Sequence, residues 1–75
     1  MTEVVGSVAV LGERSRVQGF ALAGAIVSIA DDEDAVRSAW RGLASNVTVV
    51  VLTPQAAAFL ADVLPDALRL TVVMS

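Results

Sequence analysis

The chain contains no cysteine, no histidine and no lysine. Without cysteine it cannot form a disulfide, and without cysteine and histidine it lacks the side chains of the usual zinc sites. Without lysine it cannot carry the phosphate-binding loop G-x-x-x-x-G-K-[ST]. The absence of cysteine is compatible with a cytosolic protein.

Positive charge and aromatic side chains are also scarce. The basic residues are five scattered arginines, three residues are aromatic, and the net charge at pH 7 is −3. Proteins that bind nucleic acid usually carry a basic patch with aromatic residues that stack on the bases. We therefore expect neither nucleic acid nor an anionic membrane surface as a partner, and no direct membrane insertion.

Apolar residues, in contrast, are abundant: they make up 56% of the 75 residues, and the mean hydropathy is +0.75. The uncharged stretch 42–61 has the length of a membrane span, about twenty residues, but Thr53-Pro54 in its middle is typical of the end of one element and the start of the next. The first residues, MTEVVGSV, include an acid and no base, unlike a signal peptide. A parallel sheet covered by helices on both faces explains the composition better, because its strands are continuous apolar runs. The length predicts one domain, 1–75.

Four apolar runs predict the strands of this sheet. They are Val4–Leu11, Ala25–Ala30, Val47–Leu52 and Leu68–Met74. The third run is the most apolar and is expected inside the sheet, where both faces of a strand are buried.

The segment after the first strand has the pattern of a short helix. A turn at 12–14 is followed by Ser15 and Gln18, which have the spacing of a capping box. The expected buried face consists of Val17, Phe20 and Ala21. Gly24 is placed just past the expected end of the helix, where a left-handed conformation favours glycine.

Two further helices are indicated later in the chain. The acidic run 31–34 opens one, in which Glu33 and Arg37 have the spacing of an ion pair and the buried stripe is Val36, Ala39, Trp40 and Leu43. Thr53 as the cap and Pro54 as the first helical residue open the other, whose expected buried side is Ala56, Leu60, Val63 and Leu64. Pro65 is expected to stop it.

The order β-α-β-α-β-α-β predicts an α/β fold with right-handed crossovers between parallel strands. The natural arrangement is a small flavodoxin-like (Rossmann-like) sheet of four strands in the order 2-1-3-4, with three helices covering it. In such sheets ligands bind beyond the carboxyl ends of the strands, near the point where the strand order reverses. The interface candidates there come from the loops after the first and third strands: Gly12, Glu13, Arg14, Ser15, Thr53 and Gln55.

The same loops do not carry a recognisable cofactor motif. Gly12, Gly19 and Gly24 do not form G-x-G-x-x-G, so we expect no dinucleotide and no other cofactor. The nucleophile candidates Ser15, Ser28 and Thr53 have no histidine to activate them and none lies in G-x-S-x-G. We therefore assign no catalytic residue.

The acidic run Asp31–Asp34 has three interpretations. Its carboxylates could hold Mg²⁺ or Ca²⁺, or it could resemble the phosphorylated pocket of a receiver domain. The receiver interpretation fails, because the acids do not follow the first and third strands and lysine is absent. An acidic helix start explains all four residues, so no metal ligand is assigned. Acid–base chemistry by Glu13 and Asp31 is conceivable but is not required by their spacing, and Trp40 is expected in the core.

The segment VAVLGERSRVQGFALAG, residues 8–24, resembles the opening of a small stalk protein, designated F, of V-type and archaeal-type ATP synthases. In that family a strand ending in Gly-acid is followed by T/V-x-G-F and then Leu-Ala-Gly. The matching positions are Gly12, Glu13, Val17, Gly19, Phe20, Leu22, Ala23 and Gly24. VSIADDEDAVRSAWRGL is similar to the family's second strand and acidic second helix, and VTVVVLTPQAAAFL to its third strand, which ends in Leu-Thr.

The resemblance implies a non-catalytic rotor part of the central stalk, which binds the coiled-coil shaft subunit and supports proton-driven or ATP-driven rotary coupling. It implies a cytoplasmic protein that is peripheral to the membrane through the ATPase complex. The family usually continues after the fourth strand, through a proline-containing turn, into a helical tail. Here LRLTVVMS lacks that proline and the sequence ends at Ser75, so a truncated chain and a relative without a tail both remain open.

Two other functions remain open. One is a stand-alone flavodoxin-like module that uses the loops 12–15 and 53–55 to bind a small anion or a partner protein. The other is a metal binder or carboxylate-dependent enzyme built on Asp31–Asp34. Because a small parallel sheet has two open edges, the isolated chain is also expected to form a homo-oligomer.

Overall fold

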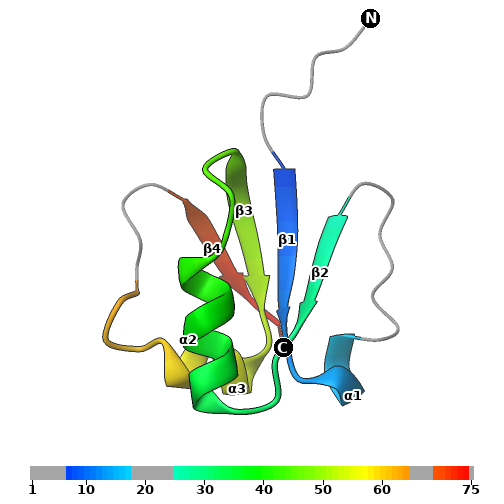
Figure 1. Cartoon of the computed structure of the whole chain (residues 1–75), viewed down its shortest axis with the longest axis vertical. Helices are drawn as coiled ribbons and strands as arrows, with labels where there is room; N and C mark the ends of the chain where they lie inside the picture. The colour runs from blue at the N-terminus through cyan, green and yellow to red at the C-terminus, as the bar shows by residue number, and fades with distance from the viewer. Residues whose placement is uncertain (1–6, 18–24, 65–68, 75) are drawn as a thin grey trace, which may run out of the picture.

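The computed structural model describes residues 7–17, 25–64 and 69–74, which form an alternating series of strands and helices (Figure 1). The elements are β1 Ser7–Gly12, α1 Arg14–Val17, β2 Ala25–Ile29, α2 Glu33–Arg41, β3 Val47–Leu52, α3 Pro54–Phe59 and β4 Leu70–Val73. The predicted order of elements is confirmed. The parts of the expected strands and helices that fall within 1–6, 18–24, 65–68 or 75 lie outside the described residues. These parts include Gln18, Phe20, Ala21, Gly24 and Pro65.

The sheet has four parallel strands in the order β2-β1-β3-β4, as the sequence predicts. β1 and β3 are the interior strands. Their pairing is regular from Val8 opposite Val49 to Leu11 opposite Leu52, after a shift in register at Ser7/Val8. The run 47–52, which the sequence predicts inside the sheet, therefore lies where a strand has a neighbour on each side.

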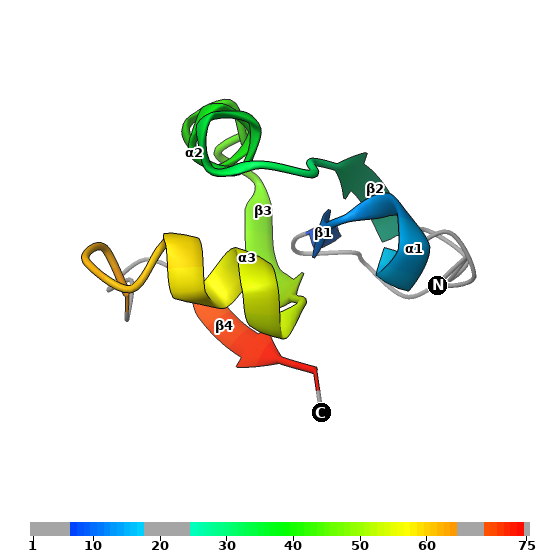
Figure 2. The same ribbon diagram turned by 90° about the horizontal axis from the view of Figure 1, so that it is seen from below.

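The helices lie on both sides of this sheet. Figure 2 shows α2 and α3 on one side, here called the first face, and α1 on the other, the second face. This distribution follows from right-handed crossovers, because the chain moves in one direction from β1 to β2 and in the opposite direction from β2 to β3 and β4. The main core lies on the first face and contains Ala9, Leu11, Ala30, Val36, Val47, Val50, Leu52, Ala56 and Leu60.

Helix α2 forms as the sequence predicts. The carboxylate of Asp32 accepts the backbone N–H of Ala35 at 2.8 Å, so Asp32 is the N-cap of the acidic first turn. The predicted stripe faces the core, with Val36 fully buried and Ala39, Trp40 and Leu43 packed around it. The guanidinium of Arg69, at the start of β4, lies 5.8 Å from the centroid of the Trp40 ring.

The predicted ion pair on α2 extends to the region after α3. Arg37 Nε lies 3.1 Å from the Glu33 carboxylate, and Arg37 Nη2 lies 2.7 Å from the carboxylate of Asp62. Hydrogen bonding to Arg37 lowers the pKa of Asp62. Both carboxylates are exposed to solvent, so the contact orients α2 and the residues after α3 more than it stabilises the fold.

Two helix predictions are wrong in detail. Ser15 does not cap the first helix: α1 begins at Arg14, and the carbonyl of Glu13 accepts the N–H groups of Arg16 and Val17. Helix α3 ends at Phe59, six residues before Pro65, because the N–H of Leu60 is shared between the carbonyls of Ala56 and Ala57 and the following turn is tighter. Of the predicted buried side of α3, Ala56 and Leu60 are buried and Leu64 is half-buried, but Val63 is 40% exposed.

The described helices leave parts of both faces of the sheet exposed. α1, the described helix on the second face, has its main contacts with β1 and β2. Leu70 and Val72 on the second face of β4 are 63% and 44% exposed, and Ile26 and Val73, on the first face of the edge strands, are 46% and 50% exposed. In the described part of the chain, helices therefore lie on both faces but leave the edge strands partly exposed. No helix in the described part of the chain is long and apolar enough to cross a membrane.

Candidate interface at the carboxyl ends of the strands

The loops after β1 and β3 meet at the carboxyl end of the sheet. The backbone N–H of Thr53 donates to the carbonyl of Leu11 at 3.2 Å, and the side chain of Thr53 lies against Gly12. A Cβ atom on residue 12 would lie 2.8 Å from the Cβ of Thr53, which is closer than real side chains approach. Glycine is therefore required at the end of β1 because Thr53 occupies the space beside it.

The hydroxyl of Thr53 makes two hydrogen bonds. Its oxygen accepts the backbone N–H of Ala56 at 3.2 Å, which caps α3 as the sequence predicts, and its O–H donates to Glu13 Oε1 at 2.6 Å. Thr53 is fully buried and Glu13 is half-buried. The hydrogen bond from Thr53 lowers the pKa of Glu13, because it stabilises the ionised carboxylate.

Asp31, directly after Ala30 at the end of the second strand region, joins the same cluster. Its carboxylate accepts the backbone N–H of Arg14 at 2.8 Å, and its carbonyl accepts Gln55 Nε2 at 3.4 Å. Asp31 therefore connects the loop after β1 with the start of α3 and caps α1 from seventeen residues away. Such a carboxylate also complements the positive end of a helix.

The six interface candidates occupy one end of the sheet but differ in exposure. Arg14, Ser15 and Gln55 are exposed, whereas Gly12 and Thr53 are buried. Glu13 is half-buried, and its carboxylate is hydrogen-bonded to Thr53. In this arrangement the exposed side chains can contact a partner, and the buried residues hold the loop that presents them.

The nucleophile and metal interpretations gain no support from this geometry. The hydroxyl of Thr53 already serves as donor and acceptor, and Ser28 is half-buried within β2. Asp31 and Asp32 are engaged as caps of different helices, α1 and α2. Among residues 7–17, 25–64 and 69–74, no three acidic side chains are grouped closely enough to hold a metal ion.

The structural role of Asp31 was not predicted, since the sequence places it with its acidic neighbours at the start of α2. The signal that identifies it is the strand order: with β2 beside β1, a residue just after β2 lies near the loop that follows β1.

No family model matches the chain, and neither a curated protein nor a solved structure matches it.

Proposed function

We propose that this chain is a non-catalytic component of the central stalk of a V-type or archaeal-type rotary ATPase, similar to the small stalk protein designated F. It binds the coiled-coil shaft subunit and supports rotary coupling without an active site of its own. Through that complex it is a cytoplasmic protein peripheral to the membrane.

The observation that carries this proposal is the contact between Gly12-Glu13 and Thr53. The resemblance to the stalk protein includes a first strand that ends in Gly-acid and a third strand that ends in Leu-Thr. The fold brings these two segments together across the interior strands, through the hydrogen bond between Thr53 and Glu13. Two features on which the resemblance rests, forty residues apart, thus form one structural unit in this chain, which supports the proposal more strongly than two unconnected matches in the sequence.

The alternative of a small-anion module has less support. Anions bind at helix starts through free backbone N–H groups. Here the hydroxyl of Thr53 accepts the N–H of Ala56, and the carboxylate of Asp31 accepts the N–H of Arg14. The carboxylate of Asp31, which already accepts the N–H of Arg14, therefore occupies the position that an anion would take at the start of α1.

Co-expression with the shaft subunit from the same organism tests the proposal. We expect a stable complex with one copy of each chain in size-exclusion chromatography with light scattering. Two separate peaks, with each protein folded by circular dichroism, would contradict the assignment to the stalk. In that case, thermal-shift measurements with phosphate, nucleotides and flavin would test the stand-alone module.

A further inference from the structure

Strand β4 belongs to the sheet without a share in the main core. Leu70, Val72 and Val73 are 63%, 44% and 50% exposed, and Thr71 between them is half-buried. Among the described residues, neither the buried core nor the apolar side chains packed against it include a residue of β4. The side chains of β4 therefore gain little hydrophobic stabilisation from their place in the sheet.

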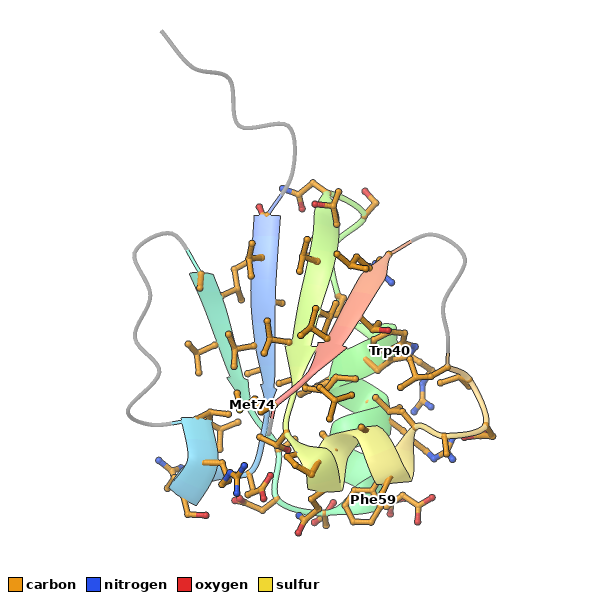
Figure 3. All side chains as sticks on the ribbon, turned by 180° about the vertical axis from the view of Figure 1, so that it is seen from behind. Trp40, Phe59 and Met74 are labelled. Atoms are coloured by element: carbon orange, nitrogen blue, oxygen red, sulfur yellow. The ribbon has the colours of Figure 1, made fainter. Side chains whose placement is uncertain are left out.

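The other edge strand, β2, has similar exposure but is better anchored. Ala30, directly after β2, is 3% exposed and belongs to the core, its N–H donates to the carbonyl of Gly12 at 2.8 Å, and α1 packs on β2. The main contacts of β4 are with β3. In the view from behind, no described helix crosses in front of β4, and Met74 lies at its carboxyl end (Figure 3).

The backbone of β4 is paired on one side only. The N–H of Met74 donates to the carbonyl of Leu52 at 2.8 Å. Because alternate residues of a strand direct their backbone groups to the same side, Leu70 and Val72 also point theirs to β3, whereas Thr71 and Val73 point theirs to the open edge. The hydrogen bonds to β3 are therefore few.

The side chain of Arg69 ties the start of β4 to α2 and to the loop before β3. Its Nε donates to the carbonyl of Val47 at 3.0 Å, and its Nη2 donates to the carbonyl of Ala44 at 3.2 Å. The guanidinium also lies 5.8 Å from the centroid of the Trp40 ring. We call these contacts the Arg69 clamp. Arg69 is half-buried, and hydrogen bonds from a charged donor are stronger than those between neutral groups.

We propose that β4 is a detachable edge strand held in place by the Arg69 clamp. When the clamp opens, β4 leaves the sheet while β2, β1, β3 and the helices α2 and α3 keep the core on the first face. The open form has β3 as its edge, with the backbone groups of Val50 and Leu52 unpaired. The fold thus contains a conformational device that presents a new sheet edge without global unfolding, and this device does not depend on the proposed function.

Amide hydrogen exchange of the whole chain, followed by NMR under native conditions, separates local opening from global unfolding. The probes are the N–H groups of Leu70 and Val72. The reference is the N–H of Thr53, which donates to the carbonyl of Leu11 between the interior strands. We expect both probes to show one common opening equilibrium and at least about tenfold less protection than Thr53. Equal protection of the probes and Thr53 would overturn the proposal.

Two variants distinguish the clamp from general loss of stability. Arg69→Met keeps an apolar side chain but removes the guanidinium, and it should speed exchange at Leu70 and Val72 about tenfold. The matched control is Asp32→Ala, which removes the N-cap of α2. It should speed exchange at Thr53 about fivefold and leave Leu70 and Val72 unchanged, because α2 stays folded when β4 opens.

Either variant can contradict the proposal. If Asp32→Ala speeds exchange at Leu70 and Val72 as much as at Thr53, β4 opens only when the whole domain unfolds. If Arg69→Met leaves exchange at Leu70 and Val72 unchanged, the Arg69 clamp does not hold the strand.

Discussion

At the scale of single residues, Gly12 and Thr53 show that glycine can be required by close packing alone. Replacing Gly12 with alanine would force its Cβ against the buried side chain of Thr53. We expect Gly12→Ala to lower the free energy of unfolding by about 1–3 kcal/mol, the usual range for overpacking. In a domain of this size each kcal/mol lowers Tm by about 4–8 °C, which differential scanning calorimetry detects.

Gly42 is the matched control for this substitution. It ends α2 with φ of −85°, and a Cβ there would lie 3.3 Å from its nearest neighbour, the carbonyl oxygen of Ser38. Because a Cβ at this distance requires a shift of only a few tenths of an ångström, Gly42→Ala should change stability much less than Gly12→Ala. Equal losses in the two variants would show that glycine at position 12 is not required by Thr53.

The lowered pKa of Glu13 predicts a pH-dependent contribution to stability. Since the folded state favours the carboxylate, the unfolded chain takes up the proton first when the pH falls. The contribution is complete above the ordinary glutamate pKa of about 4.3 and is lost as the pH falls through the lower pKa of the folded state. We expect the difference in unfolding free energy between the wild type and Glu13→Gln, measured with urea, to shrink between about pH 6 and pH 3.

The Thr53→Val variant tests whether the hydrogen bond from Thr53 causes this pH dependence, because valine has nearly the same shape as threonine without the hydroxyl. In that background Glu13→Gln should show much less pH dependence, since the hydrogen bond that favours the carboxylate is absent. A difference that stays constant with pH in the wild-type background would contradict the role of the hydrogen bond.

At the scale of elements, the sequence predicts what marked local signals decide, and it misses what distant contacts or unmarked local changes decide. The apolar run 47–52, the acidic helix start at 31–34 and the cap Thr53 are local signals, and the structure confirms them. The start of α1 was wrong because Asp31, supplied by the neighbouring strand region, caps Arg14 in place of a capping box at Ser15. The end of α3 was wrong because the tightening at Leu60 involves no glycine or proline that a sequence pattern can detect.

The placement of the helices belongs to the same scale. Apolar composition predicts helices on both faces, but the order 2-1-3-4 with three crossovers assigns two helices to one face and one to the other. This placement was implied by the predicted topology and by the handedness of the crossovers. Ile26 on β2 and Leu70 and Val73 on β4 are exposed on strands that have a neighbour on one side only, which the apolar composition did not reveal.

At the scale of the whole molecule, the exposed apolar surface and the edges β2 and β4 predict self-association of the isolated chain. Strand edges present unpaired backbone groups, and Ile26 and Leu70, on these two edges, are 46% and 63% exposed. Because β2 has 5 residues and β4 has 4 residues, few backbone groups can pair at either edge, and the association should be weak and should grow with concentration. Light scattering should then give a mass that rises above 7.7 kDa as the protein is concentrated.

Two changes should prevent the chain from associating with itself. Leu70→Lys places a charge on the edge strand β4, and lysine on an edge opposes pairing with another chain. Addition of the shaft subunit should have the same effect on the wild type, because a partner bound to the exposed apolar surface competes with a second copy. A monomer at every concentration would contradict the predicted self-association. A homo-oligomer that persists in the presence of bound shaft would show that the copies associate through a surface the partner does not use, with the β2 edge as the first position to test, by Ile26→Lys.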